Sequence, residues 1–161
     1  MRALILAAVL IVGPVVGSAP YALGQAPMEA GNQSDVQAIT QLLNDQYAAW
    51  NRQDIDGFMI PLWQSPSLVY VTEGQFCLGW QEAKAMIERS YSDRSSMGTA
   101  IPERIQINFV SSDYATSIDW WTVRFKTTSV RGISTDAWRK FAEGWRIVET
   151  HATVSDFPNL P

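Results

Sequence analysis

The order of two hydrophobic periods along the chain most constrains its fold. In residues 34–91 the apolar side chains recur mainly at the spacing of amphipathic helices, interrupted by one short β-prone pair. In residues 105–153 they alternate with polar side chains, as they do in strands. Helices followed by a mostly antiparallel meander are typical of an α+β domain with helices on one face of a curved sheet. The 161 residues suffice for one such domain.

Three helices are predicted in the first part of the chain. Ser34 and Gln37 have the spacing of a capping box at the start of the first helix. Residues 51–53 form a polar corner, and Asp54 is the predicted N-cap of a short second helix. The third helix is predicted over residues 80–91, where apolar side chains share one side.

Two short strands are predicted before the third helix, and longer strands are predicted after it. Residues 67–71 and 76–78 form a hairpin around a turn at residues 72–75. The later strands are predicted near residues 105–109, 114–125, 134–141 and 145–153.

The N-terminal segment is typical of an export signal. Arg2 precedes an apolar run from Ala3 to about Val16, and small residues at Ala22 and Gly24 fit a signal-peptidase site. The run is shorter than the roughly 20 residues that a membrane-spanning helix needs, so cleavage is favoured over an uncleaved anchor. We therefore expect a signal peptide at residues 1–24, a flexible lead-in at 25–33, the folded domain at 34–155 and a C-terminal tail at 156–161. The protein is then secreted or periplasmic, with no stable membrane insertion after cleavage.

Composition argues against several partners and sites. The chain carries 12 Lys and Arg against 16 Asp and Glu, which argues against a nucleic-acid partner. Cys77 is the only cysteine, which excludes an internal disulfide and a cysteine-based zinc site. Because His151 is the only histidine, we predict no transition-metal site, and no cofactor is called for.

Ordered segments of the chain resemble a known family. They are YAAWNRQDIDGFM (47–59), LWQSPSLVYV (62–71), GWQEAKAMIERSY (79–91), Met97-Gly98 and FAEGWRIVETHAT (141–153). Together they resemble the NTF2-like superfamily, specifically its SnoaL-like and DUF4440 branch. The resemblance implies a cone-like fold, in which a curved sheet wraps around helices and leaves a pocket open at one end. It also implies homodimerisation through the sheet, and packing of Trp50 against Phe58 at the corner between helices.

The last predicted strand holds a candidate acid–base pair. Two-residue alternation puts Trp145, Ile147, Glu149 and His151 on one face. The branch often ends in a strand reading roughly WRIVHDHTS; here Glu149 takes the first His position and His151 keeps its place. Glu149 could orient the imidazole of His151, which exchanges a proton near neutral pH. The alternative interpretation is a hydrogen-bonded pocket or rim histidine without a catalytic role.

Five further residues are candidates for the pocket wall: Tyr47, Trp63, Tyr70, Asp119 and Trp121. The aromatic rings offer flat surfaces to an organic ligand, although such rings also fill cores and interfaces. Asp119 lies in an apolar β run, where a carboxylate is costly to bury without a partner. It is predicted either to pair with a charged residue on the exposed sheet face or to be a pocket acid.

Three functions remain open from the sequence. The first is binding of a small, largely apolar organic molecule without turnover. The second is a cofactor-independent lyase, isomerase or hydrolase that uses His151, oriented by Glu149 or Asp119. The third is a protein-interaction or dimerisation module in the envelope, whose sheet face presents Trp120, Trp121 and Trp138.

Overall fold

The computed structural model of the protein describes residues 33–155. The predicted signal peptide and the C-terminal tail lie outside the described residues, as does all of the lead-in except Gln33. Within the described part, no helix is long and apolar enough to cross a membrane.

Three α-helices and a short 3₁₀ helix accompany the sheet. They are α1 (Gln33–Asn51), α2 (Ile55–Phe58), α3 (Trp80–Ser90) and the 3₁₀ helix η1 (Arg94–Met97). Asp54 is the N-cap of α2, and its Oδ1 accepts a hydrogen bond from Gly57 N at 2.8 Å, as the sequence predicts. Asn51 does not cap a helix; its side chain bonds instead to the backbone of Ala100.

Six strands form one mixed sheet. They are β1 (Val69–Thr72), β2 (Gln75–Leu78), β3 (Thr99–Phe109), β4 (Tyr114–Arg124), β5 (Ser129–Phe141) and β6 (Gly144–Val154), in the order β2-β1-β6-β5-β4-β3. Every pairing is antiparallel except β1 with β6, which run parallel. The predicted α+β class with a curved, mostly antiparallel sheet is confirmed, with the β1–β2 hairpin placed between α2 and α3.

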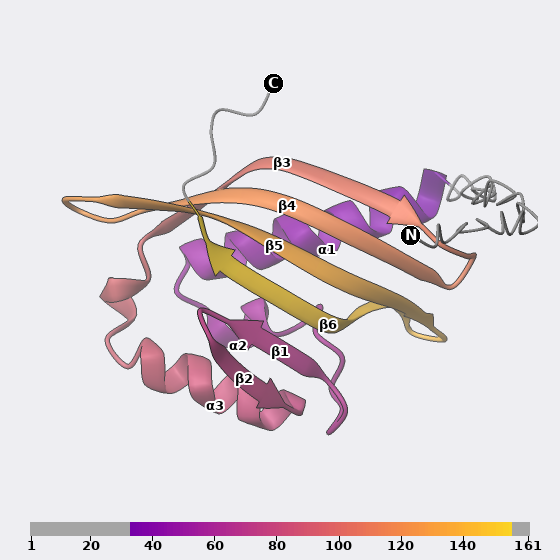
Figure 1. Cartoon of the computed structure of the whole chain (residues 1–161), viewed down its shortest axis with the longest axis horizontal. Helices are drawn as coiled ribbons and strands as arrows, with labels where there is room; N and C mark the ends of the chain where they lie inside the picture. The colour runs from indigo at the N-terminus through magenta and orange to yellow at the C-terminus, as the bar shows by residue number, and fades with distance from the viewer. Residues whose placement is uncertain (1–32, 156–161) are drawn as a thin grey trace, which may run out of the picture.

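The helices cover one face of the long strands. In Figure 1, α1 runs behind β3, β4 and β5, while the hairpin and α3 lie beyond β6. The core between these layers contains Leu43 of α1, Trp138 of β5 and Ile147 of β6, all almost fully buried. Asp35 fastens the start of α1 to the sheet, since its Oδ1 accepts hydrogen bonds from Trp145 Nε1 at 2.9 Å and Lys140 Nζ at 2.7 Å.

A β-bulge in β6 reverses the alternation that the sequence predicts there. Ala137 pairs with Glu149 but the next residue, Trp138, pairs with Ile147, so Val148 is the extra residue. Because one inserted residue turns all later side chains to the opposite face, Ile147 points into the core while Glu149 is exposed. The predicted sharing of one face by residues 145, 147, 149 and 151 is therefore wrong beyond the bulge.

Candidate functional site

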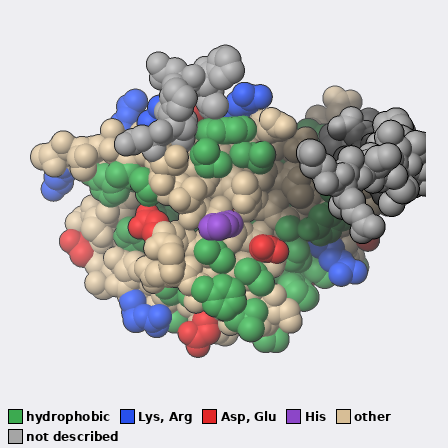
Figure 2. Space-filling view, in the orientation of Figure 1, with side chains coloured by type: hydrophobic (Ala, Val, Ile, Leu, Met, Phe, Trp, Pro, Cys, Tyr) green, Lys and Arg blue, Asp and Glu red, His purple; other side chains and the backbone are tan. Residues whose placement is uncertain are grey.

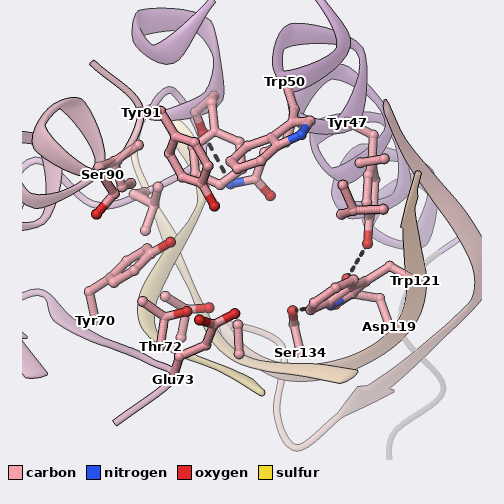
Figure 3. Close-up of a pocket in the computed structure, with 18 of the residues that line it drawn as sticks. Tyr47, Trp50, Tyr70, Thr72, Glu73, Ser90, Tyr91, Asp119, Trp121 and Ser134 are labelled. Atoms are coloured by element: carbon pink, nitrogen blue, oxygen red, sulfur yellow. Dashed lines mark hydrogen bonds between the residues drawn. The ribbon is translucent and has the colours of Figure 1, made fainter. Parts of the chain in front are cut away.

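A cavity of about 250 Å³ lies between the helices and the inner face of the sheet (Figure 3). Aromatic side chains make up much of its wall: Tyr47, Trp50, Phe58, Tyr70, Tyr91, Trp121 and Phe125. Apolar walls with a few polar groups are typical of small-molecule sites, whose volumes are about 300–1,000 Å³. This cavity lies just below that range and suits a small ligand.

Regular alternation along β4 aims three polar or aromatic side chains inward. Ser117, Asp119 and Trp121 share the inner face of the strand. Trp121 lies over β5 because its neighbour there is Gly132, where an added Cβ would stand 2.2 Å from the indole ring. The indole Nε1 of Trp121 donates a hydrogen bond to Ser134 Oγ at 2.9 Å. This bond fixes the ring at the cavity wall.

The C-terminal end of α1 is fastened to β3, which positions the helix side of the cavity. The Asn51 side chain donates to Ala100 O at 2.9 Å and accepts from Ala100 N at 2.7 Å. The ring of Trp50 contacts Phe58 at 5.3 Å between centroids, which confirms the packing expected at the corner. Tyr47 lies about one helical turn earlier and points across the cavity toward β4 (Figure 3).

Asp119 is the most unusual group in the cavity. Its side chain is 4% exposed, and Tyr47 Oη donates a hydrogen bond to its Oδ2 at 2.5 Å. The other oxygen, Oδ1, is buried without a hydrogen-bond partner among the described residues. Burial and the nearby charge of Asp136 raise the pKa of Asp119 to about 7, although hydrogen bonding from Tyr47 and from the backbone N–H of Asp119 itself opposes the shift. Burial, with the charge of Asp119, also raises the pKa of Tyr47, so its phenol remains a donor.

Asp136 is a second buried carboxyl in the wall of the same cavity. Its Oδ2 accepts a hydrogen bond from Ser117 Oγ at 2.9 Å, and Ser117 Oγ in turn accepts one from Trp138 Nε1 at 2.9 Å. The Thr150 side chain also bonds to Asp136. Burial raises the pKa of Asp136, and these two side-chain hydrogen bonds partly offset that effect. Asp136 is therefore well supplied with donors, whereas Asp119 has one oxygen left open.

The structure brings four of the predicted pocket residues together. Tyr47, Tyr70, Asp119 and Trp121 all line the cavity. Of the two predictions for Asp119, the pocket acid holds, and an ion pair on the exposed sheet face is wrong because the side chain points inward. The part of these four residues in binding a ligand stays a prediction.

The predicted acid–base pair does not line the cavity. Glu149 and His151 are both exposed on the opposite face of β6. Figure 2 shows the single histidine, in purple, on the outer surface of the molecule. The physical reason is the bulge at Val148, which turns Thr150 and Ala152 inward in their place. The prediction that the pair points into the pocket is therefore wrong.

Trp63 also lies outside the cavity. The segment before it pairs with β6 through a bridge between Leu62 and Ile147, and Leu62 takes the inward position. Trp63 then falls on the other side, where its ring stacks on Phe141 at 5.4 Å. Trp63 lines a separate hollow instead, so its prediction as a residue of this pocket is wrong.

The predicted tryptophan surface is not formed. Trp138 is fully buried in the core, and Trp121 lines the cavity. Trp120 alone lies on the outer face of β4, half-buried beneath the guanidinium of Arg104 at 5.1 Å. Because the three rings do not share a face, they cannot form one partner surface.

Sequence reasoning missed several residues of the site, among them Asp136, Ser134 and Tyr91. Ser134, Asp136 and Trp138 occupy alternate positions of β5, and that spacing next to a tryptophan could have indicated an inward-facing acid. Tyr91 follows α3, and its ring contacts Trp50 at 5.0 Å. Within residues 33–155, no group of three or more His, Cys, Asp or Glu side chains is placed to hold a metal ion.

Comparisons with solved structures find proteins of similar architecture. Neither protein-family models nor curated proteins give a match to the chain. An NTF-2 like protein of unknown function from Shewanella oneidensis is 29% identical with a TM-score of 0.66, covering 73% of this chain and 98% of that one. A cystatin-like fold protein from Burkholderia xenovorans is 20% identical with a TM-score of 0.63, covering 79% of this chain and 96% of that one.

A third solved structure agrees with these two. It is a nuclear transport factor 2 (NTF2-like) superfamily protein from Salmonella enterica serovar Typhimurium, 20% identical with a TM-score of 0.62. The match covers 79% of this chain and 95% of that one. The SnoaL-like and DUF4440 branch stays a prediction. By its architecture, this chain has the NTF2-like fold, which is also called cystatin-like.

Proposed function

We propose that the protein binds a small, largely apolar organic molecule in the cavity between α1, α3 and the sheet. The observation that carries the proposal is the cavity of about 250 Å³, with its aromatic wall and one unpartnered buried oxygen on Asp119. A buried acceptor without a donor costs about 1–3 kcal/mol, and a ligand that supplies a donor removes that cost. The cone-like enclosure and the SnoaL-like branch belong to this proposal.

Ala152 and Thr153 offer a matched pair of variants to test the site. They are neighbours on β6, but Ala152 lines the cavity whereas Thr153 is exposed. We expect neutral one- and two-ring aromatic compounds to bind the wild type in ligand-observed NMR. Ala152→Phe should abolish that binding by filling the cavity, while Thr153→Phe should preserve it. Equal binding to wild type and Ala152→Phe would place the ligand elsewhere and contradict the proposal.

Acid–base catalysis in the same cavity is a second candidate function. It is favoured by the raised pKa of Asp119, because a group that titrates near neutral pH can both give and take a proton. In this version Asp119 takes the role that the sequence analysis assigned to His151. If the wild type converts a bound compound, Asp119→Asn should abolish turnover and keep binding, while His151→Ala should leave both unchanged. Full turnover by Asp119→Asn would exclude this role.

Export and dimerisation are part of the proposal and rest on the sequence. The basic start, the apolar run and the small residues before Gln25 support cleavage after residue 24. Mass spectrometry of the protein from the extracellular or periplasmic fraction should find the N-terminus near Gln25. Sedimentation should show a homodimer joined through the sheet; a monomer at micromolar concentration would contradict this part.

A further inference from the structure

The charged side chains that line the cavity are all acidic. Three carboxyl groups line it, from Glu73 near the β1–β2 turn and from Asp119 and Asp136 in the sheet. Among residues 33–155, no Lys, Arg or His lines the cavity. Its other titratable side chains are the phenols Tyr47, Tyr70 and Tyr91. A carboxylate or phosphate ligand would meet only like charge at low dielectric, which disfavours anions strongly.

The buried polar atom of the cavity that lacks a hydrogen-bond partner among the described residues is an acceptor, Oδ1 of Asp119. The carboxyl group of Asp136 accepts hydrogen bonds from the side chains of Ser117 and Thr150. One oxygen of Asp119 accepts a hydrogen bond from Tyr47 Oη, and the other has no hydrogen-bond partner in the described part of the chain. A carboxylate oxygen in this position is completed by a ligand that donates hydrogen bonds, and a charged donor gives the strongest such bond.

The aromatic wall suits the same ligand. In Figure 3 the rings of Trp50, Tyr91 and Tyr70 lie across the cavity from Trp121 and Asp119. Ring faces attract organic cations, and their apolar surface buries the carbon frame that carries the charge. Carboxyl groups and aromatic rings together, without a basic side chain, form the chemistry that recognises an organic ammonium group.

We propose that the cavity selects small organic amines in their protonated form, with the ammonium group held by the carboxyl group of Asp119. This inference rests on the proposed binding function and names its ligand class. Burial and Asp136 raise the pKa of Asp119, so the empty cavity holds a proton near neutral pH. The bound ammonium group takes the place of that proton as the positive partner of the carboxyl group.

Three indole compounds of similar size test the ligand class by charge alone. Tryptamine is cationic, tryptophol is neutral and indole-3-acetate is anionic. At pH 8, where the carboxyl groups are largely ionised, calorimetry should give tryptamine at least about tenfold tighter binding than tryptophol, as expected for one charge-assisted hydrogen bond. Indole-3-acetate should show no binding. This ratio is measured on the wild type and depends on no variant folding.

A variant then locates the selectivity. Asp119→Asn keeps an acceptor for Tyr47 but removes the charge, so tryptamine should lose at least about tenfold in affinity while tryptophol changes by less than about threefold. Asp45→Asn removes a charge from an exposed position of α1 outside the cavity and should affect tryptamine much less.

The outcomes separate the two proposals. Tryptophol binding as tightly as tryptamine, or tighter, would overturn the amine class and leave the cavity as a site for neutral molecules. Selectivity for tryptamine that survives in Asp119→Asn would overturn the role of Asp119. Absence of binding by all three compounds, together with no binding of the neutral aromatic panel, would overturn the proposed function as well.

Discussion

Replacing Asp119 by Asn should change how stability depends on pH. Its carboxyl has a pKa raised from 3.8 to about 7 in the folded protein. A group with a raised folded pKa binds its proton more tightly in the folded state, so the free energy of unfolding falls as pH rises from about 4 to about 7. At about 1.4 kcal/mol per pH unit, the loss amounts to about 4 kcal/mol. Above that range the contribution is constant.

Urea unfolding at pH 4, 5, 6, 7 and 8 measures this effect. The variant has no titrating group at position 119, so its stability relative to wild type should rise by several kcal/mol between pH 4 and pH 8. A constant cost of the new amide shifts all points equally and does not hide the trend. Asp45→Asn, at an exposed position of α1, controls for the loss of one negative charge. Curves for Asp119→Asn and wild type that run parallel within about 0.5 kcal/mol would refute the reasoning.

Three other variants test the frame around the cavity. Gly132→Ala should push the Trp121 ring away from β5 and lower the free energy of unfolding by about 1–3 kcal/mol, measured in urea; an unchanged midpoint would contradict the contact. Asn51→Ala removes both hydrogen bonds to Ala100 and should cost about 1–3 kcal/mol in the same assay, with a wild-type curve counting against this fastening. His151→Ala should stay within about 0.5 kcal/mol of wild type, because the side chain is exposed. The affinity of His151→Ala for tryptamine should equal that of wild type. A weaker affinity would show that His151 takes part in binding.

Features that depend on local chemistry could be predicted from the sequence. Asp54 is an N-cap because its carboxylate reaches a backbone N–H three residues away, which requires nothing beyond the short segment itself. The contact of Trp50 with Phe58 across the corner was expected from the family resemblance and is present. The α+β class follows from the change of hydrophobic period along the chain.

Features that depend on pairing between distant segments could not. Whether Asp119 faced solvent or the pocket was open because its partner, Tyr47, lies 72 residues earlier in the chain. The strand in which Asp119 lies could present either face to the helices until its neighbours were placed. Trp63 was misplaced for the same reason, since only the bridge between Leu62 and Ile147 decides which of two neighbours points inward.

The bulge at Val148 shows how one such pairing decides the chemistry of the site. Strict alternation would place His151 inside, where a base could serve the carboxyl groups. With the bulge, Thr150 takes the inward position and bonds to Asp136, so a neutral hydroxyl group replaces an imidazole. The cavity therefore keeps its buried carboxyl groups without any cationic side chain in the described part of the chain. Because burial of such groups lowers stability at neutral pH, a ligand that supplies positive charge would stabilise the folded protein, which is why we expect the positive partner to come from outside the chain.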